Sequence, residues 1–413
     1  MNIPDSIRQE VQALLLDLLR FPSTRGQEGP AIRYLHDRMQ PLTDECQLVP
    51  IDAALMQDPD YAFPLPGHTY RDTPNLECRI KGGGGGPTVL FNTHLDVVPA
   101  SEGQVDAFDP RARDGVIYGR GACDAKGQAA MFYALARLVR ERGWRPAGDL
   151  IFHFVVEEEC GGNGTLAMVR RGVRADAAVV GEPSNLAVVP AVRGAVWFEL
   201  RVFGRAGHSG NVAGRVSAVD KAIQAIRILQ DYHDQLLAAS RHLPLFDQFP
   251  DPMPLTVGQF QAGHWPSSVP SEAVLKGVLG FLPNKNRHQV MDEMRAALQQ
   301  YGDEWLREHF QLSFPMLHSD GNRLPVDHPL VTALLAAARR QGLPEKVTAL
   351  TGSADPWFYQ NMAGIPTVIF GPGSIVHAHA KDEQVRLDDI LTAAGVLADF
   401  VEDFCRAQPT PAR

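Results

Sequence analysis

The chain has 413 residues, 45% of them hydrophobic and 21% charged, which is enough apolar material for more than one hydrophobic core. Its formal net charge is -9 and neither sign gathers in long blocks, so nucleic acid and anionic membrane surfaces are not expected partners. No uncharged apolar run reaches the roughly 18 residues of a membrane span, so none is predicted. A small molecule is therefore the expected partner.

The N-terminal stretch, residues 7–24, is apolar but is interrupted by Glu10, Asp17 and Arg20. These charges come too early for the apolar region of a signal peptide, so the stretch predicts an amphipathic first helix. The cysteines are odd in number and show no C-x-x-C spacing, which favours neither a disulfide framework nor a cysteine zinc site. They are Cys46, Cys78, Cys123, Cys160 and Cys405. A reducing cytoplasm is the expected location.

Short apolar runs alternate with helical patterns along most of the chain. The runs are residues 88–92, 149–156, 175–180 and 366–370, and residues 125–142 give the clearest helical pattern. This alternation is typical of an α/β fold with a mostly parallel sheet flanked by helices. We predict one such domain, made of residues 1–193 and 308–413.

Residues 194–307 have a different pattern. Every second residue of 196–202 is apolar, which is typical of a half-exposed antiparallel strand. A helix, strands near 256–262 and 271–282, and a helix from about Arg287 are expected to follow. The order β-α-β-β-α resembles a split βαβ, ferredoxin-like module. We therefore predict a smaller α+β domain inserted into the first.

The glycine run 82–86 has two interpretations. A phosphate-binding loop would need the glycines to follow a strand and open a helix, whereas here they separate two strand-like segments, 77–81 and 88–92. A flexible hairpin-type connection is therefore the better interpretation.

His94 and Asp96 interrupt an otherwise apolar strand. Residues two apart in a strand point to the same face, so the two side chains would project together beyond residues 88–92. One interpretation is a hydrogen-bonded pair in the core, because a buried carboxylate needs a partner. The other is a metal-bound His94 that Asp96 orients.

Further acidic and imidazole residues occur at comparable places, just past a strand or before a helix. They are Asp124, Glu157, Glu158, Glu159, Glu182, His377 and His379. The carboxyl ends of parallel strands open on one crevice, so these residues can converge there. Singly they have ordinary explanations, such as a helix N-cap for Asp124 or a solvated face for the Glu run. Together they would repel one another unless a divalent cation were bound, and their oxygen and nitrogen ligands suit zinc, manganese or cobalt.

Six motifs, in order along the chain, resemble those of the dinuclear-zinc aminoacylase and carboxypeptidase family, which includes acetylornithine deacetylase, succinyl-diaminopimelate desuccinylase and related dipeptidases. The motifs are HLDVVP, GRGACDAKG, VVEEECGGNGT, VGEPSN, GRAGHSG and HAKDE. The resemblance covers nearly the whole chain and implies two metal ions, zinc or else cobalt or manganese. It implies that His94 and Glu182 hold one ion, that Glu159 and His379 hold the other, and that Asp124 bridges them.

The resemblance also assigns catalytic roles. Glu158 aligns with the general base, and Asp96 with the residue that orients the first metal-binding histidine. His208 aligns with a histidine that reaches the oxyanion from the small domain of the other subunit of a homodimer. Glu157 stands where the family usually has Asp, and a shift of one place along the Glu run would exchange the roles of Glu158 and Glu159.

Three other places qualify the resemblance. Gly280 stands where many relatives have an arginine that binds a substrate carboxylate. His377 lies two residues before His379 and competes with it as a ligand, although the H-x-x-D-E spacing favours His379. The loops Thr351–Asp355 and Gly371–Ser374 are expected to line the substrate cleft.

The function implied is that of a cytoplasmic, metal-dependent hydrolase of N-acyl amino acids, similar to acetylornithine deacetylase. A dipeptidase or carboxypeptidase of the same family is the alternative, because peptides present the same amide bond. A non-catalytic metal-binding protein with this fold would have no need of Glu158. A dinucleotide oxidoreductase is disfavoured by the placement of the glycines.

Overall fold

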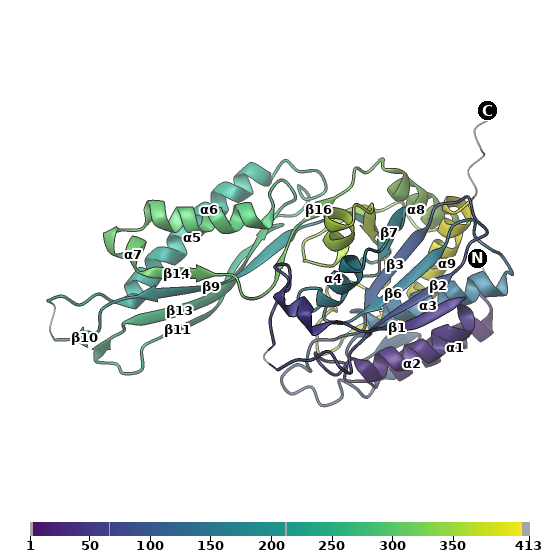
Figure 1. Ribbon diagram of the computed structural model, residues 1–413, viewed down its shortest axis with the longest axis horizontal. Helices are drawn as coiled ribbons and strands as arrows, with labels where there is room; N and C mark the ends of the chain where they lie inside the picture. The colour runs from purple at the N-terminus through teal and green to yellow at the C-terminus, as the bar shows by residue number, and fades with distance from the viewer. Residues whose placement is uncertain (1–2, 66, 211–212, 407–413) are drawn as a thin grey trace.

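The computed structural model describes residues 3–65, 67–210 and 213–406, which fold into an α/β part and a smaller elongated part (Figure 1). The larger sheet has nine strands in the order β1-β2-β6-β3-β7-β18-β8-β16, with β17 paired to β8. Its strands are β1 (Glu45–Val49), β2 (Asn75–Ile80), β3 (Val89–His94), β6 (Leu150–Val155), β7 (Ala177–Val180), β8 (Val188–Val192), β16 (Asn322–Arg323), β17 (Val347–Leu350) and β18 (Thr367–Ile369). The central strands β6, β3, β7 and β18 run parallel, as the sequence predicts.

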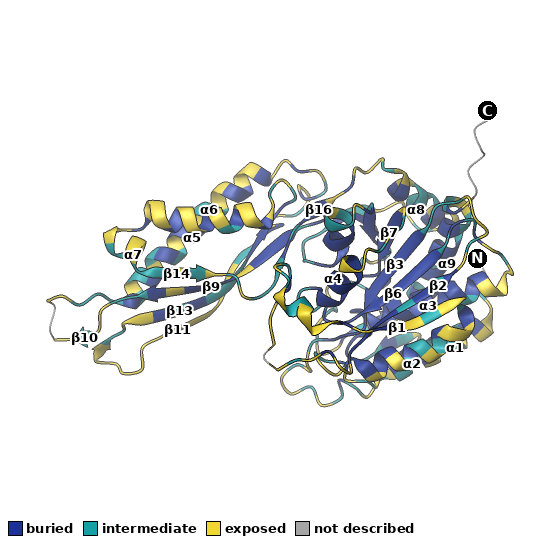
Figure 2. Cartoon of the chain, in the orientation of Figure 1, coloured by how far each residue is buried: buried dark blue, intermediate teal, exposed yellow. Residues whose placement is uncertain are grey.

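Helices flank this sheet. They are α1 (Asp5–Leu19), α2 (Gly29–Met39), α3 (Lys126–Glu141), α4 (Asn163–Arg170), α8 (Pro329–Arg340) and α9 (Leu387–Phe404), with short helical turns at Gln40–Leu42, Ala53–Gln57 and Phe358–Met362. The predicted N-terminal amphipathic helix is α1, which buries Val11, Leu14 and Leu18. Helix α3 is buried along most of its length because it packs between β3, α1 and α9 (Figure 2).

The smaller part is an antiparallel sheet of five strands with its own hydrophobic core. Its elements are β9 (Gly194–Phe203), β11 (Leu255–Ala262), β13 (Glu272–Phe281), β14 (Phe310–Ser313), β15 (His318–Ser319), α5 (Ala218–Ser240), α6 (Arg287–Tyr301) and α7 (Glu304–Glu308). In β9 the alternate residues Val196, Phe198, Leu200 and Val202 are fully buried beneath α5 and α6, while Trp197 is exposed (Figure 1). The β-α-β-β-α order predicted for this segment is confirmed.

The chain leaves the larger sheet at β9 and returns to it at β16. Strands β14 and β15 still pair with β9, although both lie beyond residue 307. We therefore propose an inserted domain that begins at Gly194, as the sequence predicts, and extends to Ser319.

The glycine run does not form a hairpin-type connection, because strand β6 lies between β2 and β3 and pairs with both. The loop packs instead on the turn before β6, where the N–H groups of Gly83 and Gly84 donate to the carbonyls of Pro146 and Ala147. A side chain at Gly82 would come within 2.5 Å of the Ala147 carbonyl oxygen, which explains the glycine there.

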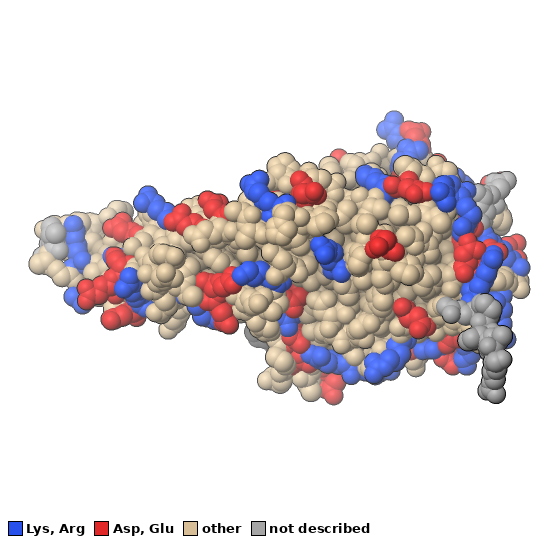
Figure 3. Space-filling model, turned by 90° about the horizontal axis from the view of Figure 1, so that it is seen from above, with Lys and Arg blue, Asp and Glu red and all other residues tan. Residues whose placement is uncertain are grey.

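Two small sheets complete the described structure. Strands β4 (Arg111–Arg113), β5 (Val116–Tyr118) and β19 (Gln384–Arg386) form one, and β10 (Gly207–His208) with β12 (Ser268–Val269) forms the other. Seen from above, basic and acidic side chains are interspersed over the surface (Figure 3). Within the described residues, no helix combines the length and the apolar character that crossing a membrane requires.

Candidate metal centre

Parallel strands place the acidic and imidazole residues at one edge of the larger sheet. His94 is the last residue of β3, Glu159 follows β6 and Glu182 follows β7. The remaining two come from the residue before the α3 N-cap, Asp124, and from the loop after β18, His379. The structure brings all five together, as expected of side chains at the carboxyl ends of neighbouring parallel strands.

Asp124 lies between the two histidines. Its Oδ1 is 3.1 Å from His94 Nε2 and its Oδ2 is 3.5 Å from His379 Nε2. Glu182 Oε1 is 3.8 Å from His94 Nε2, and Glu159 Oε1 is 2.9 Å from His379 Nε2. Each carboxylate oxygen of Asp124 therefore faces a different histidine.

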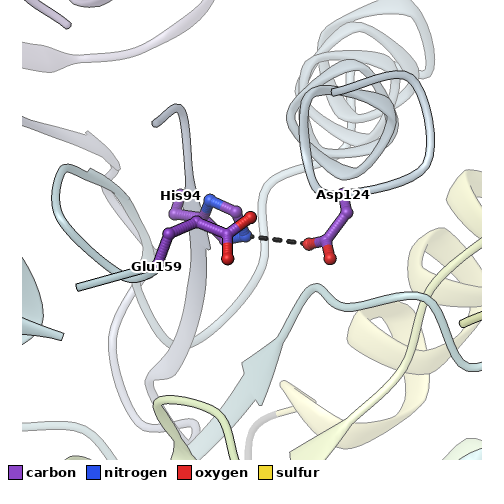
Figure 4. Close-up of side chains that lie close together, drawn as sticks. All are labelled: His94, Asp124 and Glu159. Carbon is purple, nitrogen blue, oxygen red and sulfur yellow. Dashed lines mark hydrogen bonds and ion pairs between the residues drawn. The ribbon is translucent and has the colours of Figure 1, made fainter. Parts of the chain in front are cut away.

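Two overlapping groups of ligand atoms converge on His94. One comprises His94, Asp124 and Glu159 (Figure 4), and the other His94, Glu158 and Glu182; within each group the ligand atoms lie within 4.8 Å of one another. The His94 Nδ1–H donates to the backbone carbonyl of Asp96 at 2.9 Å, which leaves the Nε2 lone pair available as a ligand.

The carboxylates of the cluster lie close enough together to shift one another's pKa values. Burial and the neighbouring Glu182 raise the pKa of Glu158 well above its ordinary value. Burial also raises the pKa of Glu182, and Asp124 adds to that effect against the opposing charge of His94. Burial opposes ionisation of Asp124 too, but His94 and His379 hold its pKa below the ordinary value. The cluster therefore favours a bound cation, which would stabilise all of these carboxylates in their ionised form.

The Asp96 side chain contacts the turn after β6, which carries Glu158 and Glu159, more closely than it contacts the His94 ring. Its Oδ1 and Oδ2 accept hydrogen bonds from the backbone N–H groups of Glu158 and Glu159, at 3.1 and 3.0 Å. Its Oδ1 lies 3.5 Å from His94 Nδ1, which is farther than the carbonyl oxygen that this nitrogen contacts. The Asp96 side chain thus links the end of β3 to the turn after β6.

Glu157 is not part of a solvated acidic face. It is 1% exposed, and its carboxylate accepts hydrogen bonds from Arg25, Tyr70 and Asn163 at 2.9, 2.6 and 2.7 Å. Its φ of 60° lies in the left-handed region, which is unusual for a residue with a side chain. These contacts fix the residue immediately before Glu158.

Sequence reasoning missed Glu383 and Arg120. Glu383 Oε1 accepts hydrogen bonds from the backbone N–H groups of Cys123 and Asp124, at 3.1 and 3.0 Å, and its other oxygen pairs with the buried Arg120. The two residues therefore fix the loop that carries Asp124. The signal available was the HAKDE motif itself, which ends at Glu383.

The two loops expected at the cleft lie beside the cluster. Asp355, at the end of Thr351–Asp355, is buried and accepts a hydrogen bond from Thr165. Burial raises its pKa to about 6. Gly371 approaches the backbone of Glu182 so closely that a Cβ would stand 2.6 Å from the Glu182 carbonyl oxygen.

Two of the sequence-derived candidates lie outside the cluster. The His377 side chain forms no hydrogen bond or ion pair with the cluster, whereas His379 contacts both Glu159 and Asp124, so the geometry favours His379. His208 is exposed in β10, at the far end of the smaller sheet from β3 and β7 (Figure 1). Within one chain, the structure does not bring His208 to the other candidate residues.

Arg193 occupies the space beside Gly280. Its Nη1 is 3.0 Å from where a Cβ on Gly280 would stand, and the backbone of Met253 is equally close, so this position has no room for a side chain. Arg193 donates to the carbonyls of Thr351 and Gly194 and forms no ion pair with any residue that the structure describes. Burial lowers its pKa to about 10. A guanidinium therefore lies next to the glycine, although it comes from the residue that joins β8 to β9.

The family model of peptidase family M20/M25/M40 matches residues 90–403. An N-formyl-4-amino-5-aminomethyl-2-methylpyrimidine deformylase of Bacillus subtilis is 28% identical, over 81% of this chain and 84% of that protein. An acetylornithine deacetylase of Myxococcus xanthus is 30% identical, over 79% and 83%. The fold is similar to that of a metallo-carboxypeptidase from Sulfolobus solfataricus, with a TM-score of 0.75 and 18% identity over 96% of this chain and 99% of that one.

Proposed function

Since the chain belongs to peptidase family M20/M25/M40 and is a hydrolase of that family, we propose that it hydrolyses the amide bond of N-acyl amino acids with the help of two divalent metal ions. The observation that carries the proposal is the position of Asp124, whose two carboxylate oxygens face different histidines. Such a carboxylate can bridge two ions.

The residues present fit two metal ions. Glu182 Oε1 is buried and has no hydrogen-bond partner among the described residues, which is costly unless a cation is bound there. His94 and Glu182 would hold one ion, Glu159 and His379 would hold the other, and Asp124 would bridge them. The oxygen and nitrogen donors suit zinc best, with cobalt or manganese as alternatives.

When bound, the ions polarise the amide carbonyl and make the attacking water more acidic. Glu158 takes the proton of that water and passes it to the leaving nitrogen. Two features of its surroundings support this role. Its side chain accepts no hydrogen bond from any residue that the structure describes, and it lies close to His94 and Glu182, which would hold one ion. Asp96 keeps Glu158 in place through the backbone N–H of that residue.

The tetrahedral oxyanion also needs a hydrogen-bond donor. We propose that His208 supplies it from the partner subunit of a homodimer, since His208 is exposed and remote from its own chain's cluster. The cytoplasmic location inferred from the cysteine content remains a prediction.

Two substrate classes are candidates for the acyl compound. An N-acyl amino acid such as acetylornithine carries a carboxylate, and the Arg193 guanidinium, which forms no ion pair within the described part of the chain, suits one. A compound like the substrate named for the Bacillus subtilis deformylase carries no carboxylate, and the missing side chain at Gly280 suits that class. The first class is our proposal because a half-buried cation without an ion pair among the described residues favours an anionic ligand.

The experiment is a substrate panel assayed after dialysis against a chelator and again after addition of zinc, cobalt or manganese. It contains N-acetylornithine, the N-acetyl amine of the same length without the carboxylate, an N-formyl aminomethylpyrimidine, and dipeptides. We expect hydrolysis to disappear on chelation, to return with metal and to be fastest for N-acetylornithine. Faster cleavage of the formyl compound would establish the second class, and hydrolysis that survives complete removal of metal would overturn the proposal.

A further inference from the structure

Two of the cysteines form a cross-strand pair that the spacing in the sequence does not reveal. Cys46 in β1 lies directly opposite Cys78 in the antiparallel strand β2. Their Sγ atoms are 3.0 Å apart, and both residues are free thiols in the structure. The pair lies at the edge of the larger sheet, since β1 is its terminal strand.

The backbone already meets the requirement for a disulfide. Directly opposed residues of antiparallel strands have Cα atoms about 4.5–5.5 Å apart. Disulfides span Cα separations of about 4.4–6.8 Å. The two sulfur atoms therefore need side-chain rotation, and no shift of the strands, to reach bonding distance.

The two thiols are chemically unequal. Cys46 is half-buried, whereas Cys78 is fully buried, so a reagent from solution reaches Cys46 first. The hydrogen bond between the thiols lowers the pKa of Cys46, while the same hydrogen bond and burial raise that of Cys78. The half-buried Cys46 is thus the better thiolate, and the fully buried Cys78 can attack only a sulfur that is already beside it.

We propose that Cys46 and Cys78 form a reversible disulfide site that reacts with a low-molecular-weight disulfide such as glutathione disulfide. The Cys46 thiolate attacks one sulfur of glutathione disulfide, and the first glutathione leaves as a thiolate that takes up a proton. Cys78 then loses its proton and attacks Cys46 Sγ, which releases the second glutathione. In total, two protein thiols are oxidised to one disulfide, and one glutathione disulfide is reduced to two glutathione thiols.

The bond would close the base of a segment that supports the candidate site. Residues 47–77 connect the two cysteines, and Tyr70 of this segment donates a hydrogen bond to Glu157. The backbone N–H of Ala62 donates to Asn163, which also contacts Glu157. A disulfide at 46–78 would restrict this segment in the unfolded chain, so the oxidised protein should have a higher Tm than the reduced protein.

The test is to treat the reduced, folded protein with glutathione disulfide and to measure its intact mass, with unreduced peptide mapping to locate the bond. We expect the loss of two hydrogen masses, a peptide pair joined through Cys46 and Cys78, and full reversal by dithiothreitol. A thermal melt of both forms should give the higher Tm for the oxidised form.

Variants separate the two steps. In Cys78→Ser, the reaction should stop at a glutathione adduct on Cys46. In Cys46→Ser, Cys78 should stay unmodified. The control Cys405→Ser changes a buried cysteine outside the pair and should still form the bond. A wild-type protein that shows no 46–78 peptide pair, whether its thiols stay reduced or Cys46 keeps its glutathione, would overturn the proposal.

Discussion

Glu157, Glu158 and Glu159 are adjacent in the sequence but have three different surroundings. Glu157 is buried against Arg25, Tyr70 and Asn163, and Glu159 contacts His379. Glu158 lies between them near His94 and Glu182. In the sequence this run of like charges resembles a solvated face. In the structure Glu157 stabilises the fold, and our proposal assigns Glu158 to proton transfer and Glu159 to metal binding.

A second single residue, Glu28, should make the stability of the protein depend on pH. Its side chain is fully buried, and burial followed by the nearby Asp96 raises its pKa to about 8 from an ordinary value of 4.5. Between these two pH values the unfolded chain carries an ionised Glu28 while the folded chain keeps the proton. Unfolding then releases a proton, so this residue lowers stability as the pH rises from about 5 to 8.

Glu28→Gln removes that dependence. We expect the variant to gain roughly 1–3 kcal/mol relative to wild type between pH 5 and pH 8, measured by urea unfolding at both values. Glu102→Gln changes an exposed glutamate and should keep the wild-type difference. A pH dependence in Glu28→Gln equal to that of wild type would show that Glu28 is ionised in the fold.

The sequence could predict which ligand candidates share a sheet edge because four of them follow a strand of recognisable pattern and Asp124 precedes a recognisable helix. Apart from Asp96, it could not predict the residues that hold them in place. Arg25 and Glu157 are 132 positions apart, and Glu383 is 259 positions from Asp124. Contacts over such separations depend on how loops pack, and hydrophobic periodicity carries no information about that.

At the scale of elements, the turn between β6 and α4 depends on two glycines. Gly161 and Gly162 have φ values of 106° and 80°, in the left-handed region. A Cβ on Gly161 would stand 2.4 Å from that of Ala62, and a Cβ on Gly162 would stand 2.3 Å from Phe358 Cε2. The glycines therefore allow the turn that carries Glu158 and Glu159 to pack tightly on its neighbours.

Gly162→Ala should lower the free energy of unfolding by at least about 2 kcal/mol, because it combines an unfavourable φ with a collision against a buried ring. The matched control is Gly172→Ala, where φ is 82° and no atom lies within 4 Å of the added Cβ. It should cost only about 1 kcal/mol, the strain of the left-handed backbone alone. Chemical denaturation of both variants makes the comparison, and equal losses would contradict the packing argument.

The order of the strands within the sheet is harder to predict from the sequence than their positions along the chain. The strands on either side of the glycine run were recognisable, but their partner β6 comes more than fifty residues later in the chain and enters between them. Local pattern indicates strands without indicating their neighbours.

At the scale of the whole molecule, our proposal for His208 implies that one chain is not sufficient for catalysis. It lies in β10, at the end of the smaller part that is far from the candidate metal centre (Figure 1). If our proposed homodimer forms, each active site combines Glu158 of one chain with His208 of the other.

Mixing two inactive variants tests this arrangement. Glu158→Gln and His208→Ala proteins, combined in equal amounts under conditions that allow subunit exchange, should form mixed dimers as about half of the total. Each mixed dimer has one intact site of two, so roughly a quarter of wild-type activity should return. No recovery despite demonstrated exchange, or a fully active His208→Ala protein, would remove His208 of the partner subunit from the mechanism.

The proposed mechanism requires two metal ions beside a glutamate that is not itself a ligand. The most direct measurement is the metal content per chain, by elemental analysis, together with kcat for wild type, Glu158→Gln and Glu159→Gln. We predict two ions in wild type, and two ions with a kcat at least about 100-fold lower in Glu158→Gln. Glu159→Gln should retain less metal, because it replaces a ligand. Loss of metal in Glu158→Gln with full retention in Glu159→Gln would contradict these roles, and an active wild-type protein without metal would contradict metal-dependent hydrolysis.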